Sequence, residues 1–298
     1  MILQKNDTIG IAATARHIDE ATIANTVRLL ESWGLKVKLS SALFERDNAF
    51  AGNDASRAKA FNELLLDGEV KAILLARGGY GTVRIIDDID FSGFAENPKL
   101  IIGFSDVTVI HAHINKHYPT PTLHACMPIT MQGDYYNETT ISSLQNALFN
   151  NKINYTFAKH PLNRNGNVEA KLVGGNLSVL YSLLASDSLV SFDDCILFIE
   201  DIGEYYYHID RMMIALKRAG KLAKLKGLLV GGMSSMNENA PPFEFNKDCY
   251  QIISETVAEY NYPVYFSFPA GHEALNVAVR LGSLCTLRSD ATQVYFEQ

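Results

Sequence analysis

Ser105 stands where the sequence could place a nucleophile at a sharp corner. It lies in "KLIIGFSDVTVI" (99–110), where the apolar run from Leu100 to Phe104 predicts a buried strand and the residues that follow predict a helix. A serine on a tight strand-to-helix turn is typical of a nucleophile elbow, beside which a helix N-terminus stabilises negative charge. The G-x-S-x-G pattern is incomplete, because Val107 replaces the last glycine. A simple helix cap is therefore the alternative interpretation.

The glycine-rich loop "ARGGYGTVR" (76–84) follows the apolar stretch "KAILLA". Consecutive glycines let the backbone approach a ligand closely and point its N–H groups at an anion. The loop matches neither a Walker loop nor a G-x-G-x-x-G dinucleotide motif, so a plain turn is the alternative. A serine nucleophile would need two donors for its oxyanion, and the backbone N–H of Asp106 and of Gly78 or Gly79 could supply them.

A serine nucleophile also needs a base and a carboxylate that orients the base. Among the eight histidines, His272 in "FSFPAGHEALN" follows a Pro-x-Gly turn after a predicted strand, and His124 could also reach the cleft. Glu200 ends the apolar strand "CILFIE", where an unpartnered acid would be costly. Glu200 and Asp201 must point to opposite faces of this strand, so one of them faces inward. A structural ion pair with Arg211 is the alternative for this carboxylate.

The elements that must position these residues alternate between strand and helix in the first half of the chain. Strands are predicted in "DTIGIAATA", "LKVKLS", "KAILLA" and "LIIGF", and helices in "DEATIANTVRLLESWG", "NDASRAKAFNELLLDG", "VTVIHAHINKH" and "ETTISSLQNALFN". This alternation predicts an α/β fold with parallel strands and helices on both faces. Since ligands bind at the carboxyl ends of such strands, the glycine loop and the Ser105 corner are expected to be neighbours.

The Asn-rich segment 151–167 has no sustained apolar period, and it is predicted to be a linker. Residues 1–150 would then form the parallel-sheet α/β domain that carries the serine. Residues 168–298 would form a smaller, β-rich mixed domain that carries the glutamate and the histidine. Its strands are predicted in "CILFIED", "LKGLLVGGM", "PVYFSFPAG", "AVRLGSLCTLRS" and "TQVYFEQ", and a helix in "HIDRMMIALKRAG".

The bulk properties argue against several classes of partner. A chain of 298 residues is long for one core, and its net charge of −7 gives no reason to expect nucleic acid or an anionic membrane. No apolar run approaches the roughly 18 residues that span a bilayer. The N-terminus reads as a first strand and not as a signal peptide. Four widely spaced cysteines suggest buried free thiols and no zinc site. We expect a cytoplasmic protein with no metal and no cofactor.

Five motifs follow one another in an order that resembles the LD-carboxypeptidase family of serine peptidases. They are "ARGGYGTVR", "IIGFSD", "LVGGNLSVL", "LFIEDIGEYYYHIDRMM" and "FPAGH", and together they span nearly the whole chain. The family includes murein tetrapeptide carboxypeptidases of peptidoglycan recycling and microcin C self-immunity peptidases. The resemblance implies an N-terminal α/β domain, a C-terminal β-rich domain and a site between them.

The resemblance also implies roles for particular residues. The triad falls on Ser105, Glu200 and His272, and the oxyanion hole falls on the backbone N–H groups of Gly79 and Asp106. A small muropeptide-like peptide is the implied substrate, and a homodimer is the implied assembly.

Substrate-binding residues are expected at Gly78, Tyr80 and His124. After His124 many relatives have Gly-Pro, whereas this chain has Ala-Cys, in a segment that lines the substrate side in the family.

We predict a serine carboxypeptidase that hydrolyses an L,D peptide bond, and the resemblance implies that it releases terminal D-alanine from a murein tetrapeptide. Two alternatives stay open. One is a microcin C-type immunity peptidase that cleaves a peptidyl or aminoacyl nucleotide amide. The other is a non-catalytic α/β protein whose glycine loop binds a phosphate or a sugar.

Overall fold

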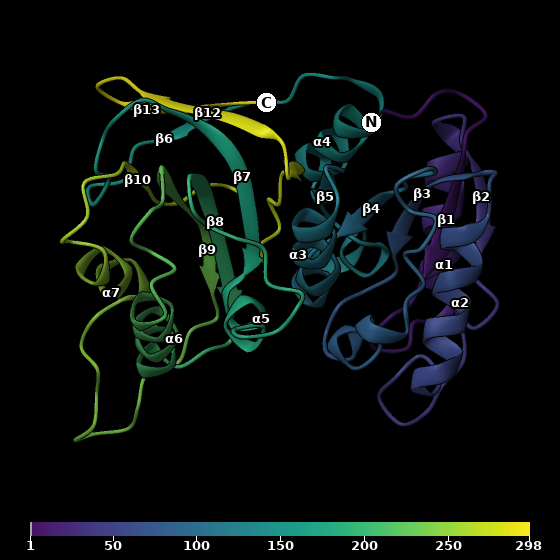
Figure 1. Cartoon of the computed structure of the whole chain (residues 1–298), viewed down its shortest axis with the longest axis horizontal. Coiled ribbons are helices and arrows are strands. Elements are labelled where there is room, and N and C mark those ends of the chain that lie inside the picture. Colours follow the sequence, from purple (N-terminus) through teal and green to yellow (C-terminus); the bar gives the residue numbers. More distant parts are fainter. Residues whose placement is uncertain (1) are drawn as a thin grey trace.

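The computed structural model of the chain describes residues 2–298 and distributes them over two sheets (Figure 1). The first sheet and its helices comprise β1 (Thr8–Ala12), α1 (Glu20–Ser32), β2 (Lys36–Leu39), α2 (Asp54–Leu66), β3 (Val70–Leu75), β4 (Leu100–Gly103), α3 (Thr108–His117), β5 (Thr122–His124), α4 (Glu138–Phe149) and β11 (Val279–Leu281). The second sheet and its helices comprise β6 (Asn154–Ala158), β7 (Val168–Asn176), α5 (Leu177–Ser182), β8 (Cys195–Ile202), α6 (Tyr206–Arg218), β9 (Gly227–Ser234), α7 (Cys249–Thr256), β10 (Val264–Tyr265), β12 (Leu284–Ser289) and β13 (Gln293–Glu297).

The first sheet has six strands in the order β11-β5-β4-β3-β1-β2. Strands β1 to β5 pair in parallel, and only β11 is antiparallel to its neighbour. Strands β3 and β4 are almost wholly buried, as expected of apolar strands covered on both faces. Helix α2 begins where the sequence predicts, because the Asn53 side chain accepts a hydrogen bond from Ser56 N at 2.8 Å. The predicted parallel α/β half is confirmed.

The second sheet has seven strands in the order β10-β9-β8-β7-β12-β13-β6. Strands β7 to β10 pair in parallel, whereas β12, β13 and β6 extend the sheet through antiparallel pairs. The prediction of a mixed, β-rich second half is confirmed. Helices α6 and α7 lie side by side on this half, on the left in Figure 1.

Two segments differ from the sequence-based expectation. The segment 151–167, predicted as a linker, contains β6, whose Phe157 is buried while the residues on either side of it are less so. The stretch "AVRLGSLCTLRS", predicted as one strand, forms two. A turn at Gly282 sends β11 into the first sheet and β12 into the second. In both segments the strands form by pairing with strands that are distant in the sequence. The local pattern of apolar residues does not indicate such pairing.

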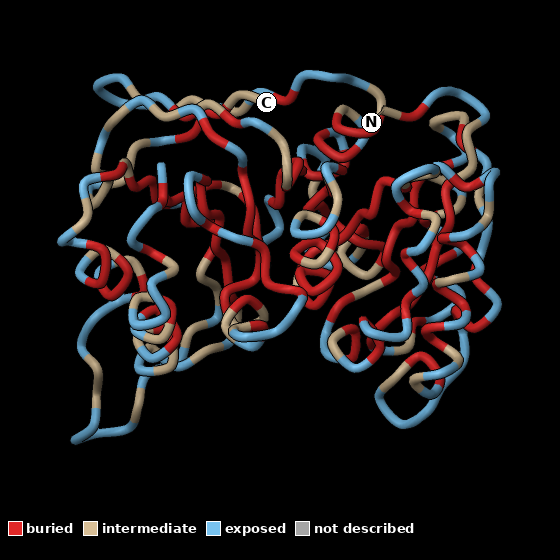
Figure 2. Tube along the Cα trace, viewed as in Figure 1, coloured by how far each residue is buried: buried red, intermediate tan, exposed pale blue. Residues whose placement is uncertain are grey.

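The two halves of the chain meet where α3 packs against β7. Gly175, near the end of β7, lies so close to Thr108 that an added Cβ would be 2.5 Å from its Oγ1. Asn176 N donates a hydrogen bond to Thr108 Oγ1 at 3.0 Å. Figure 2 shows a continuous buried region that runs from β7 and β8 to α3. This junction brings the carboxyl ends of strands from both sheets together.

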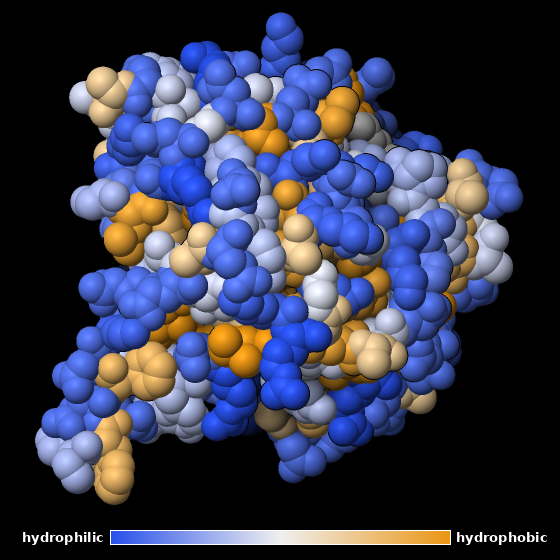
Figure 3. All heavy atoms as spheres, turned by 60° about the vertical axis from the view of Figure 1, so that its left-hand side comes forward, coloured by the Kyte–Doolittle hydropathy of each residue, from blue (hydrophilic) through white to orange (hydrophobic). Residues whose placement is uncertain are grey.

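The outer face of the β-rich half is mostly hydrophilic (Figure 3). The loop between β9 and α7 projects from it at the lower left of Figure 1, and its Phe243 is 77% exposed. Within residues 2–298, no helix combines the length and the apolar character needed to cross a membrane.

Candidate active site

Ser105 occupies the turn between β4 and α3. A short 3₁₀ turn, Ser105–Val107, replaces an ordinary loop, and α3 begins at the next residue. Ser105 has φ +64°, a left-handed conformation that non-glycine residues rarely adopt. Such a conformation costs about 1–3 kcal/mol, so the surrounding structure must stabilise it. The sharp corner predicted from the sequence is therefore present and strained, with Ser105 partly exposed to solvent.

Glu200 and His272 form a buried pair. Glu200 lies near the end of β8 and is fully buried, and its Oε2 accepts a hydrogen bond from His272 Nδ1 at 2.7 Å. Burial alone would raise the pKa of Glu200, but the charge and the hydrogen bond of His272, with a smaller contribution from the adjacent His124, lower it to about 2. Burial also opposes the charged form of His272, but Glu200 outweighs this and raises the histidine pKa. The two groups thus stabilise each other's charge. Within residues 2–298 no group hydrogen-bonds to Nε2 of the imidazole, which can therefore take a second partner.

The His272 ring lies beside the serine corner. Its centroid is 4.7 Å from the ring of Phe104, the residue that immediately precedes Ser105. No hydrogen bond joins Ser105 Oγ to His272 in the part of the chain that the structure describes. Catalytic hydrogen bonds are often long in ligand-free enzymes and shorten when substrate binds. The arrangement places a histidine–glutamate pair from one half of the chain beside the turn that carries Ser105 in the other half.

The glycine loop passes directly over Ser105. A Cβ atom added to Gly78 would lie 2.9 Å from Ser105 Cβ, 3.0 Å from Ser105 Oγ and 3.3 Å from Asp106 N. Only glycine permits this close approach. Gly79 has φ +112°, and its N–H makes no backbone hydrogen bond within residues 2–298. The N–H of Asp106 lies in the first turn before α3, where backbone donors lack intrahelical partners. The backbone donors of Gly79 and Asp106 therefore each immediately follow one of the two residues in contact, Gly78 and Ser105.

The carboxyl group of Asp106 fastens the glycine loop to the serine corner. Asp106 is buried, and its Oδ2 accepts a hydrogen bond from Thr82 N at 2.8 Å. Burial raises the pKa of Asp106, although the hydrogen bonds from Thr82 and Gly81 and the charge of Arg57 oppose this. The sequence indicated a role only for the backbone of Asp106. Its side chain neither caps α3 nor faces the reaction, but it ties two loops together.

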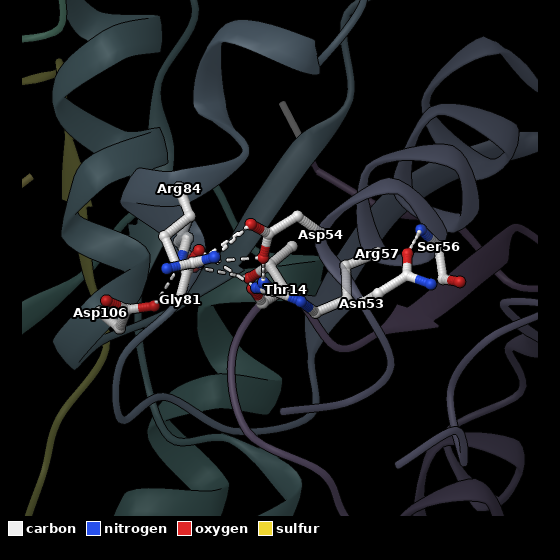
Figure 4. Close-up of polar contacts among 9 residues, drawn as sticks. Thr14, Asn53, Asp54, Ser56, Arg57, Gly81, Arg84 and Asp106 are labelled. Atoms are coloured by element: carbon white, nitrogen blue, oxygen red, sulfur yellow. Dashed lines mark hydrogen bonds and ion pairs between the residues drawn. The ribbon is translucent and has the colours of Figure 1, made fainter. Parts of the chain in front are cut away.

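A buried arginine supports the loop from behind (Figure 4). Arg57 is fully buried, and its guanidinium donates to the carbonyl oxygens of Thr14 and Gly81 and pairs with Asp54. Asp54 also binds Arg84 at 2.6 Å, so one carboxylate joins two arginines (Figure 4). Sequence reasoning missed this network, because an arginine in the middle of an amphipathic helix gives no signal that it is buried.

His124 lies behind Glu200 and not on an exposed surface. It is fully buried at the end of β5, between the rings of Phe104 and Phe198, at centroid distances of 5.6 and 5.1 Å. The sequence suggested that His124 contacts substrate, but the structure places it in the wall of the site. Tyr80, by contrast, is 51% exposed beside the ring of Phe50, at the mouth of the glycine loop.

Asp201 points away from Glu200, as strand alternation requires. Its carboxylate accepts hydrogen bonds from Asn176 Nδ2 at 2.9 Å and Ser178 N at 2.8 Å, which attaches β8 to the start of α5. Burial and the adjacent charge of Glu200 raise the pKa of Asp201 to about 7. Arg211, the ion-pair partner considered from the sequence, lies instead over the ring of Tyr207 at 5.1 Å. Glu200 is thus the carboxylate that faces the histidine.

Comparison with known proteins assigns the family. Residues 9–125 match the LD-carboxypeptidase N-terminal domain, and residues 169–287 match the LD-carboxypeptidase C-terminal domain. The two matches cover most of the chain in the order expected of the family. The chain therefore belongs to the LD-carboxypeptidase family, and it is a hydrolase of the carboxypeptidase type.

Individual relatives agree with this assignment. A probable murein peptide carboxypeptidase of Bacillus subtilis is 35% identical over 292 residues, which cover 96% of this chain and 90% of the relative. The crystal structure of muramoyltetrapeptide carboxypeptidase from Oxalobacter formigenes superposes with a TM-score of 0.87 at 26% identity, covering 97% of this chain and 98% of that one. The microcin C7 self-immunity protein MccF of Escherichia coli is 24% identical, over 94% of this chain and 90% of MccF.

Proposed function

We propose that this protein hydrolyses the L,D peptide bond of a murein tetrapeptide and releases its terminal D-alanine, with Ser105, Glu200 and His272 as the catalytic triad. The observation that carries the proposal is the 2.7 Å Glu200–His272 pair beside the strained Ser105 corner. The names of the Bacillus and Oxalobacter relatives support the choice of a murein peptide as substrate.

His272 removes the proton of Ser105 Oγ through Nε2 as the oxygen attacks the scissile carbonyl. Glu200, ionised at neutral pH because its pKa is about 2, stabilises the imidazolium that forms. The imidazolium then protonates the amine of the leaving D-alanine, and an acyl-enzyme remains on Ser105. Water, activated by the same histidine, hydrolyses the ester and restores the serine.

The oxyanion of each tetrahedral intermediate lies between the backbone N–H groups of Gly79 and Asp106. Preorganised donors of this kind typically contribute about 10²–10³ to kcat each. Asp106 has a second, indirect part in this stabilisation, because its carboxylate fixes the loop that carries Gly79.

The direct test is incubation with L-Ala-γ-D-Glu-meso-diaminopimelate-D-Ala, followed by mass spectrometry. We expect the loss of one alanine with the wild-type protein and no loss with Ser105→Ala. An S105A protein that still releases alanine at the wild-type rate contradicts the assignment of the nucleophile.

A microcin C-type activity is the second candidate, because MccF is similar over nearly the whole chain. Cleavage of a processed microcin C analogue together with an intact tetrapeptide would favour it. A folded protein that cleaves neither substrate but binds phosphate or a sugar tightly would instead be the non-catalytic binding protein. The cytoplasmic location and the homodimer stay predictions, which cell fractionation and analytical ultracentrifugation can test.

A further inference from the structure

Two arginines beside the proposed oxyanion hole have no acidic partner. Arg16 lies in the loop after β1, and Arg77 immediately precedes the paired glycines after β3. Within residues 2–298, no carboxylate oxygen lies within ion-pair distance of either guanidinium. The arginines on the other side of the same loop differ, because Arg57 and Arg84 share Asp54 (Figure 4). Cations left unpaired in this way indicate a site for an external anion.

The side chain of Arg16 lies against the glycine that carries the oxyanion donor. A Cβ atom added to Gly79 would be 2.7 Å from Arg16 Cδ and 2.9 Å from Arg16 Nε. Any other residue at position 79 would displace the arginine. Strands β1, β3 and β4 are neighbours in the sheet, so the Arg16 loop and Ser105 start two strand spacings apart, about 10 Å. Because the Arg16 side chain extends across Gly79, its guanidinium lies closer to Ser105 than the backbone of the Arg16 loop does.

Arg77 brings a second positive charge to the same place. Its Nη1 donates to the carbonyl oxygen of His17 at 3.1 Å, whereas its buried Nε has no hydrogen-bond partner within residues 2–298. Burial and the charge of Arg16 both lower the pKa of Arg77, and the nearby Asp19 opposes them. The two cations are therefore close enough to repel each other, and an anion between them would remove the repulsion and provide hydrogen-bond acceptors.

We propose that Arg16 and Arg77 bind the C-terminal carboxylate of the peptide and so restrict the enzyme to terminal residues. This inference rests on the proposed carboxypeptidase function and names the recognition site that such a function requires. In a carboxypeptidase substrate the free carboxylate belongs to the leaving residue, directly adjacent to the scissile bond. With the scissile carbonyl oxygen at Gly79 N–H, that carboxylate lies near the same glycine, against which Arg16 packs. Arginine suits this role because its planar guanidinium can donate one hydrogen bond to each of the two carboxylate oxygens.

The test compares the tetrapeptide with the same peptide ending in D-alaninamide, which keeps the scissile bond and lacks the charge. For the wild-type enzyme we expect kcat/KM to favour the acid by about 10- to 100-fold, the usual value of a hydrogen-bonded charge. Arg16→Gln and Arg77→Gln should each reduce this preference substantially, mainly through KM for the acid. Arg77→Lys keeps the positive charge but cannot form two parallel hydrogen bonds to the carboxylate, so it should retain part of the preference for the acid. The control is Arg28→Gln, an exposed arginine on α1, which should leave both rates unchanged.

The outcomes separate this inference from the function on which it rests. Wild-type protein that hydrolyses neither peptide overturns the proposed function, and the carboxylate site with it. Wild-type protein that hydrolyses the acid but keeps the same acid-to-amide preference in R16Q and R77Q overturns the carboxylate site alone. Since Arg16 is exposed, loss of folding does not explain a change in R16Q, and circular dichroism of each variant checks this point.

Discussion

The serine side of the site and the glutamate–histidine side position their groups by different means. Ser105 is held by backbone geometry: a positive φ, a glycine loop in contact with it, and a buried carboxylate that ties the two loops together. Glu200 and His272 are held by burial and by their mutual charge. Strain can be maintained only where the chain on both sides is fixed, whereas a buried ion pair persists only where mutual attraction and hydrogen bonding offset the cost of removing both charges from water.

Removing the serine oxygen should have the largest effect on activity. We expect Ser105→Ala to lower kcat by at least about 10⁴-fold, because no other group can form the acyl-enzyme. The measurement is D-alanine release from the tetrapeptide. Ser105→Gly should be equally inactive but more stable than Ser105→Ala by about 1 kcal/mol, since glycine adopts a positive φ without strain. Equal thermal unfolding of the two variants would contradict strain at this corner.

Neutralising the buried carboxylate should have the next largest effect. We expect Glu200→Gln to lower kcat by about 10²–10⁴-fold, because the imidazolium loses its ionic partner. His272 must be neutral to act as a base, so wild-type activity rises with pH through its raised pKa. The variant loses the cause of that shift, and the acidic limb of its pH–rate profile should move to lower pH.

The matched control for Glu200→Gln is Asp201→Asn, the same change at the next residue, which faces the opposite side of β8. It should change kcat by less than about tenfold and move the acidic limb much less than Glu200→Gln does, since Asp201 does not contact His272 and its charge is a smaller cause of the raised histidine pKa than Glu200 is. An equal loss of kcat in the two variants would mean that the integrity of β8, and not the charge of Glu200, supports His272.

Loosening the glycine loop should have an intermediate effect. Asp106→Ala leaves the Thr82 N–H without its acceptor and removes a negative charge near Arg57, so we expect about a 10- to 100-fold lower kcat and about 1–3 kcal/mol lower stability. Asp106→Asn keeps an oxygen that can accept from Thr82, and it should recover most of the loss in kcat. Steady-state kinetics and denaturant unfolding measure the two quantities. If Asp106→Asn were as slow as Asp106→Ala, charge and not loop attachment would be the important property.

Weakening the junction between the two halves should have the smallest effect on catalysis. Thr108→Val keeps the shape of the side chain but leaves the buried Asn176 N–H unpaired, which should cost about 1–3 kcal/mol of stability. We expect kcat to change little, because the variant keeps the packing of α3 on β7. Thr139→Val, on the exposed side of α4, is the control and should leave the melting temperature unchanged. A kcat loss as large as that of Asp106→Ala would show that this junction also aligns the site.

Much of the fold could be predicted because its signals are local. Apolar runs and capped helices indicated β1 to β4 and α1 to α4, and the alternation of these elements indicated parallel pairing. The strand β6 and the division between β11 and β12 were missed, since both depend on partners far away in the chain. The buried Arg57 and the linking role of the Asp106 carboxylate were missed for the same reason.

The sequence by itself determined the strand-to-helix corner at Ser105, the glycine loop before it, the opposite orientations of Glu200 and Asp201, and the family to which the chain belongs. These features depend on residue type, on spacing and on the alternation of side chains along a strand, all of which can be read from the local sequence. Only the tertiary structure decided that His272 meets Glu200, that His124 is buried behind this pair, and that Arg16 lies across Gly79. Such contacts join residues that are far apart in sequence, and their geometry follows from how two sheets pack together and not from any local pattern.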